Sequence, residues 1–112
     1  MASAAQNALF GTTTRTNTLL VLHLLNETHA SEIAQVLEIS LSQVQRALEG
    51  LEVAGIVVGA RMGRERRVRL NPRYVALTEL TTILDKITVT DTPLHERLAE
   101  KRRRPRRAGK TI

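Results

Sequence analysis

The chain has 112 residues, 42% of them hydrophobic and 25% charged, which is the composition of one globular domain. It contains no cysteine, which excludes disulfides, thiolate metal sites and thiol redox switches. No apolar run approaches the roughly 20 residues that span a bilayer, and the N-terminal residues do not resemble a signal peptide. We therefore expect a cytoplasmic protein without a membrane contact.

The charge is divided unevenly along the chain. Residues 1–60 carry two basic and five acidic side chains, and residues 61–112 carry fifteen and six, so the two parts have charges of −3 and +9. Such a split favours a polyanionic partner. A nucleic acid fits better than a membrane surface, because no basic amphipathic helix with an aromatic face is present.

Residues 1–12 are mostly small and polar and predict a flexible segment. A helix is expected from about Thr14, and it is apolar around most of its circumference, which is typical of a central or dimer-interface helix. Its leucines are Leu19, Leu20, Leu22, Leu24 and Leu25.

Two shorter helices follow. The first is predicted over residues 30–37, with Thr28 or His29 as its N-cap. Ser40 begins the next helix, because Ser40 and Gln43 fit a capping box. At 100° per residue, this helix places one apolar stripe opposite a polar face. The stripe consists of Val44, Ala47, Leu48 and Leu51.

Gly55 ends this helix, and the β-branched run at 56–58 begins a β-hairpin with a basic tip. Alternation in its second strand places Val68 and Leu70 on one face and Arg67 and Arg69 on the other. The arginines are therefore expected to form an exposed ridge.

A fourth helix carries an apolar stripe with spacings of three, four and three: Leu77, Leu80, Leu84 and Ile87. Such a stripe packs against its own domain or forms a seam between two chains, and both interpretations stay open. Asp91-Thr92-Pro93 begins a further helical turn. Residues 99–112 lack apolar periodicity and predict a disordered basic tail with Lys101, Arg102, Arg103, Arg104, Arg106 and Arg107.

The order helix, helix, turn, helix, hairpin, helix predicts a mainly α fold with a small β-hairpin, an α+β winged helix-turn-helix with a C-terminal helix. Its two crossing helices need a small residue at their contact, and Ala34 supplies it. Apolar side chains fill the wedge from both sides: Ile33, Leu37, Ile39, Val44 and Leu48.

Three segments, Ser31–Ala34, Leu37–Ser40 and Leu48–Val57, resemble bacterial and archaeal winged-helix regulators of the ArsR and MarR type. The likeness covers about residues 14–75. It implies that the helix over 41–53 enters the major groove and that the hairpin over 61–69 is a wing on phosphate or the minor groove. It also implies a homodimer on a near-palindromic site.

The chain departs from this family in two places. Glu38 stands where a glycine is common, so the turn either avoids a positive φ or bears a strain of about 1 kcal/mol. The metal-sensing branch uses cysteine-rich and histidine-rich sites, which this chain cannot assemble. His23, His29 and His95 share no metal-ligand spacing, and we expect neither a metal nor a cofactor.

We therefore predict a regulator that binds double-stranded DNA and is not an enzyme, since no catalytic motif is visible. Its expected parts are a flexible segment (1–12), the DNA-binding domain (13–75), a helical dimerisation segment (76–98) and the basic tail (99–112). The expected base contacts are Ser42, Gln43, Gln45, Arg46 and Glu49. The expected backbone contacts are Arg61, Arg64, Arg66, Arg67 and Arg69.

Two alternatives remain open. A pI of about 11 also fits a non-specific nucleoid-type or RNA-binding architectural protein. Winged helices also serve as protein-docking modules, because a fold does not determine a function. The sequence does not identify a small-molecule effector or a preferred DNA sequence.

Overall fold

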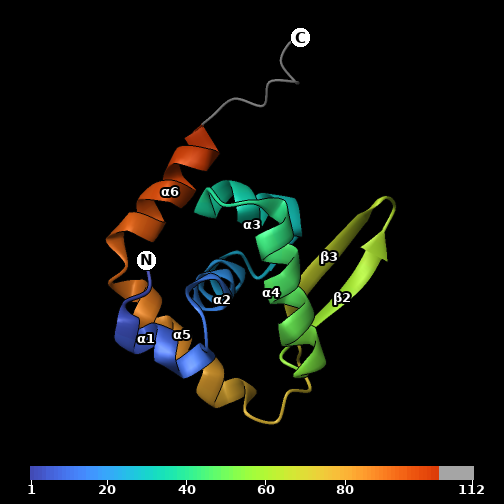
Figure 1. Cartoon of the computed structure of the whole chain (residues 1–112), viewed down its shortest axis with the longest axis horizontal. Helices are drawn as coiled ribbons and strands as arrows, with labels where there is room; N and C mark the ends of the chain where they lie inside the picture. The colour runs from blue at the N-terminus through green and yellow to red at the C-terminus, as the bar shows by residue number, and fades with distance from the viewer. Residues whose placement is uncertain (104–112) are drawn as a thin grey trace.

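Helix α2 (Thr13–Leu25) is the centre of the fold in the computed structural model, which describes residues 1–103. Leu19, Leu20, Val21 and Leu22 are all fully buried, so the helix contacts neighbours around its whole circumference. Figure 1 shows α2 surrounded by the other helices. The expectation of a buried central helix is therefore confirmed, and the core consists of aliphatic side chains.

Helices α3 (Ala30–Leu37) and α4 (Leu41–Val53) have the predicted bounds. His29 is the N-cap of α3, with its Nδ1 accepting the Glu32 N–H at 3.4 Å. Ser40 and Gln43 form the predicted capping box at the start of α4. Between them Glu38 has a φ of 59°, so the turn adopts the left-handed conformation instead of avoiding it.

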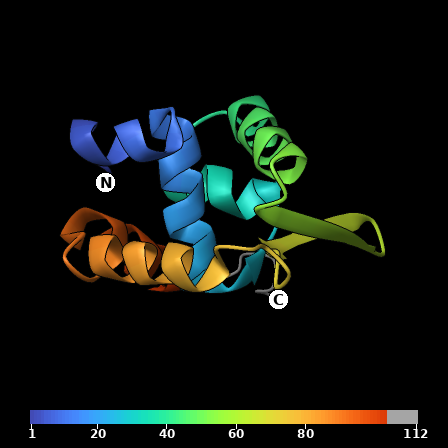
Figure 2. The same ribbon diagram turned by 90° about the horizontal axis from the view of Figure 1, so that it is seen from below.

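The sheet has three antiparallel strands in the order β1 (Glu27–Thr28), β3 (Glu65–Leu70), β2 (Val57–Met62). Strands β2 and β3 form the predicted hairpin, which projects from the helical body (Figure 2). Strand β1 was not predicted, because two residues are too short to show an alternating pattern. This strand ties the base of the hairpin to the region between α2 and α3.

Helix α1 (Ala4–Phe10) occupies part of the segment that was expected to be flexible. Ser3 and Gln6 form a capping box at its start, and Gly11 ends it with a φ of 105°, which glycine adopts readily. Ala2 also donates its backbone N–H to Asn17 of α2 at 3.0 Å. These local contacts order a segment whose composition shows no amphipathic stripe.

Helix α5 (Leu77–Val89) turns its apolar stripe into the core of the same chain, where Leu80, Leu84 and Ile87 are 7%, 0% and 9% exposed. Leu77 is only partly buried. The packing interpretation of the stripe is therefore the one that the single chain shows. Within residues 1–103, no helix is long and apolar enough to cross a membrane.

Helix α6 (Thr92–Arg103) extends past residue 98, where the helical segment was predicted to end. The expectation that disorder begins at residue 99 is wrong for residues 99–103, which are helical. Leu94 and Leu98 anchor α6 in the core, Arg97 donates to the Val36 carbonyl at 3.2 Å, and Lys101 lies 3.5 Å from Glu32. The rest of the predicted basic tail, with Arg104, Arg106 and Arg107, lies outside the described residues.

Candidate nucleic-acid interface

Helix α4 separates a buried apolar face from an exposed polar one. Val44, Leu48 and Leu51 are at most 5% exposed, with Ala47 beside them at 7%. The five predicted base-contacting residues are all exposed: Ser42, Gln43, Gln45, Arg46 and Glu49. The helical period had predicted this division, and the burial agrees with it.

The exposed residues differ in how free their side chains are. The side-chain oxygen of Gln43 accepts the Ser40 N–H at 3.3 Å, and the Ser42 hydroxyl lies 3.3 Å from that of Ser40. Gln45, Arg46 and Glu49 make no side-chain hydrogen bond or ion pair within residues 1–103. Gln43 and Ser42 therefore stabilise the start of α4, whereas the other three point polar groups into solvent.

The predicted wing arginines fall into two groups. Arg66 reaches across to α4 and donates two hydrogen bonds to the Glu52 carboxylate, one of them 3.0 Å long from Nη2 to Oε1. Arg67 donates to Glu65 at 2.6 Å and to Glu27 at 3.2 Å. The side chains of the others have no partner among residues 1–103: Arg61, Arg64 and Arg69.

These contacts shift the pKa values of Glu65, Arg66 and Arg67. The hydrogen bond from Arg67 is the main cause that lowers the pKa of the Glu65 carboxyl. Desolvation opposes it, and the charges of His29 and Arg67 lower the pKa further. Hydrogen bonds to Glu52 raise the pKa of Arg66, and hydrogen bonds to Glu65 and Glu27 raise that of Arg67. Both arginines stay cationic, but a phosphate must compete with carboxylates for them.

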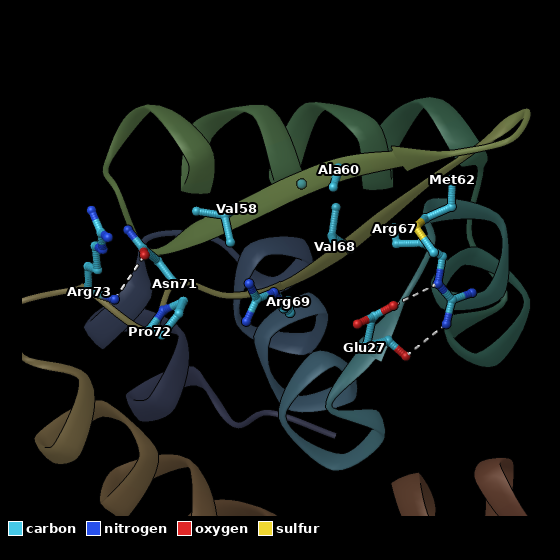
Figure 3. A pocket seen from close by; sticks show the side chains of 11 residues that line it. Glu27, Val58, Ala60, Met62, Arg67, Val68, Arg69, Asn71, Pro72 and Arg73 are labelled. Carbon is cyan, nitrogen blue, oxygen red and sulfur yellow. Dashed lines mark hydrogen bonds and ion pairs between the residues drawn. The ribbon is translucent and has the colours of Figure 1, made fainter.

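A hollow of about 430 Å³ lies on the sheet face that points away from α4 (Figure 3). Val58, Ala60 and Met62 from β2 form part of its lining, and Arg69 and Arg73 also line it. The Arg73 side chain has no partner among the described residues and was not among the predicted contacts. It follows Asn71-Pro72, beyond the alternating strand whose pattern singled out the others.

Arg15 on α2, like Arg73, is a basic residue that was not among the predicted contacts. It lies near α4. Its guanidinium lies against Gly50 of α4. Only Arg15 and Arg46 are basic in the first 60 residues. The rarity of basic residues in this half was the sequence signal that could have identified Arg15 as a candidate.

The histidines have separate local contacts. His23 Nε2 lies 2.6 Å from Asp85 of α5, and His95 Nε2 lies 2.7 Å from the Thr88 carbonyl oxygen. His29 caps α3 and lies 3.9 Å from Glu65. Among the residues that the structure describes, no group of three or more histidine and acidic side chains is placed to hold a metal ion.

The α3–turn–α4 unit, the antiparallel hairpin after it and the exposed polar face of α4 define a winged helix-turn-helix domain. No protein-family model and no curated protein sequence matches the chain. Solved structures of ZitR from Lactococcus lactis are similar to it.

A Glu-to-Ala variant of ZitR superposes with a TM-score of 0.56 at 22% identity, over 80% of this chain and 61% of that one. A double variant in apo form gives 0.57 at 22% identity, over 87% and 73% of the two chains. A Cys-to-Ser variant in complex with DNA gives 0.53 at 22% identity, over 80% and 61%. The chain thus spans 61% of the length of the first of these neighbours, and the likeness supports the fold.

Proposed function

We propose that this chain is a transcriptional regulator that binds double-stranded DNA, with α4 in the major groove and the wing on the sugar-phosphate backbone. The observation that carries the proposal is the outer face of α4, where Gln45, Arg46 and Glu49 stand exposed and unpaired within residues 1–103. The hairpin beside it presents Arg61, Arg64 and Arg69, whose side chains have no partner in the described part of the chain. The solved DNA complex of a ZitR variant, which shares the fold, supports this assignment.

The exposed groups suit the edges of bases. Arg46 can donate two hydrogen bonds to guanine, Gln45 can pair with adenine, and Glu49 can accept from the cytosine amine. Each well-formed pair contributes about 1–3 kcal/mol of discrimination against a wrong base. Arg61, Arg64 and Arg69 carry no sequence information and contribute affinity through phosphates.

Further parts of the proposal follow from the sequence. The resemblance to ArsR-type and MarR-type regulators implies the homodimer and its near-palindromic site, and the composition and motifs favour the rest. The protein acts in the cytoplasm at the nucleoid, as a homodimer on a near-palindromic site, without a cofactor and without enzymatic activity. The predicted homodimer contacts through Leu80, Leu84 and Ile87 need another surface, because the single chain already buries these side chains.

Selection of bound sequences from randomised duplex DNA tests the proposal, with the unsubstituted chain, Arg46→Ala and Lys86→Ala. Lys86 lies exposed on α5 and has the same charge as Arg46, so it is the matched control. We expect the unsubstituted chain and Lys86→Ala to enrich one inverted repeat. Arg46→Ala is expected to lose at least one base preference in each half-site.

Two other outcomes would favour the alternatives. Binding without any enriched sequence, or equal binding to RNA, would indicate an architectural protein held by its basic groups. Absence of binding at about 150 mM salt would indicate a protein-docking module. If wing and tail together neutralise about six phosphates, log K falls with log[salt] at a slope near −5.

A further inference from the structure

Arg15 lies in the first turn of α2, with its guanidinium between two glycines from different parts of the chain. A Cβ placed on Gly50 of α4 would lie 2.5 Å from Nη2 and 3.3 Å from Cζ. A Cβ on Gly11, at the end of α1, would lie 3.6 Å from Nη1. The absence of a side chain at Gly50 therefore leaves the space that the guanidinium occupies.

This guanidinium has no counter-ion among the residues that the structure describes. Its Nε is buried without a hydrogen-bond partner, and Arg15 makes no side-chain hydrogen bond or ion pair within residues 1–103. A partly buried cation without a partner is destabilising, because the protein replaces only part of its hydration. An arginine held in this way can bind an anion from outside the chain.

The position of Gly50 on α4 indicates which anion would reach the Arg15 guanidinium. At 100° per residue, Gly50 lies about 40° from Arg46 and about 160° from Glu52 around the helix axis. Gln45, Arg46 and Glu49 lie between those two flanks. Glu52 holds Arg66 of the wing. Arg15 therefore stands on the flank of the exposed face that is opposite to the wing.

A major groove is about 12 Å wide and a helix with its side chains is about 10–12 Å across, so phosphates border both flanks of an inserted helix. We propose that Arg15, held between Gly11 and Gly50, binds a backbone phosphate at the groove edge opposite to the one that the wing contacts. This inference rests on the proposed DNA-binding function. It adds a contact from α2 to those of α4 and the wing.

The test measures DNA affinity of the full chain across a salt series, using the selected duplex and an unrelated duplex of the same length. Arg15→Gln removes the charge, and we expect the slope of log K against log[salt] to become about one unit less steep per bound subunit, or about two units for a homodimer, on both duplexes. The preference for the selected sequence should stay unchanged. Lys86→Gln removes the same charge from the exposed face of α5 and should leave the slope unchanged.

Gly50→Ala provides an independent variant, because it perturbs Arg15 without removing its charge. Alanine is favoured over glycine inside a helix by roughly 0.5–1 kcal/mol, so the substitution does not weaken α4 through its propensity. We expect Gly50→Ala to lower DNA affinity in the unsubstituted chain. In the Arg15→Gln background it should have no further effect, since the displaced guanidinium is already gone.

The outcomes separate this inference from the proposed function. If the unsubstituted chain binds no DNA, the proposed function fails and the phosphate contact fails with it. If it binds DNA and Arg15→Gln keeps the original slope, only the phosphate contact is overturned. A lower melting temperature with an unchanged slope would assign Arg15 a purely structural role. If Arg15→Gln does not fold, an unchanged DNA affinity of Gly50→Ala overturns the contact.

Discussion

Glu38 holds the turn between α3 and α4 in the left-handed region, at φ 59° and ψ 45°. This conformation is about 1–2 kcal/mol less favourable for a residue with a Cβ, whereas glycine adopts it readily. Its carboxylate compensates only weakly, since it is largely exposed and lies 3.9 Å from Arg97. The strain sits in the turn that orients α4.

We therefore expect Glu38→Gly to raise the free energy of unfolding by about 0.5–1 kcal/mol. The substitution relieves the strain, but the larger entropy of glycine in the unfolded state offsets part of this gain. Urea denaturation measures this change. Glu38→Ala is the matched control, because it removes the carboxylate but keeps the Cβ. A stabilisation by Glu38→Ala as large as that by Glu38→Gly would contradict the assignment of the strain to φ.

Glu65 shows how the wing depends on pH. Its pKa is lowered in the folded chain, chiefly by the hydrogen bond from Arg67, so the interaction is present above the unfolded pKa of about 4.5. It is lost as the pH falls through the lower folded pKa. We expect Arg67→Gln to raise the pKa of Glu65, as followed by the carboxyl chemical shift in NMR. An unchanged titration would show that Arg67 and Glu65 are not paired in solution.

At the scale of elements, α5 illustrates a pattern with two physical solutions. A leucine stripe at spacings of three and four predicts a buried helix face but does not say which chain covers it. In this structure α2 and its neighbours cover Leu80, Leu84 and Ile87. Tertiary packing therefore decided a question that periodicity left open.

This packing predicts a contrast between two adjacent residues of α5. Leu84→Ala should lower the free energy of unfolding by about 2–5 kcal/mol, because a fully buried side chain leaves a cavity. Ile83→Ala, at a position that is 40% exposed, should lower it by less than about 1 kcal/mol. Thermal denaturation at several protein concentrations measures both. A loss for Leu84→Ala that depends strongly on concentration would instead place this side chain in a dimer interface.

At the scale of the whole molecule, α6 connects the helical body with the basic C-terminal residues. Leu98 is 5% exposed and Arg97 caps the end of α3 through the Val36 carbonyl. Beyond residue 98, Lys101 lies 3.5 Å from Glu32 of α3. The first residues of the predicted tail are therefore helical and contact the domain, whereas sequence composition assigned them to a disordered tail.

Two truncations separate these roles. A chain that ends at Arg103 should keep the melting temperature of the full chain but bind DNA with a less steep salt dependence, because it lacks four of the basic side chains. A chain that ends at Glu96 should melt at a lower temperature, because it loses Leu98 and the contacts of Arg97 and Lys101. Equal melting temperatures of the two truncated chains would contradict this division.

The sequence by itself determined the bounds of α3, α4 and the hairpin, because capping residues, periodicity and glycine breaks act over a few neighbouring positions. It also determined which face of α4 is polar. Tertiary structure alone decided that α5 packs inwards, that α6 is folded to residue 103, and that Glu52 and Glu27 pair with wing arginines. It also decided that Arg15 lies between Gly11 and Gly50. Apart from the step between Gly11 and Arg15, these contacts join residues distant in the sequence, and no local pattern encodes such distances.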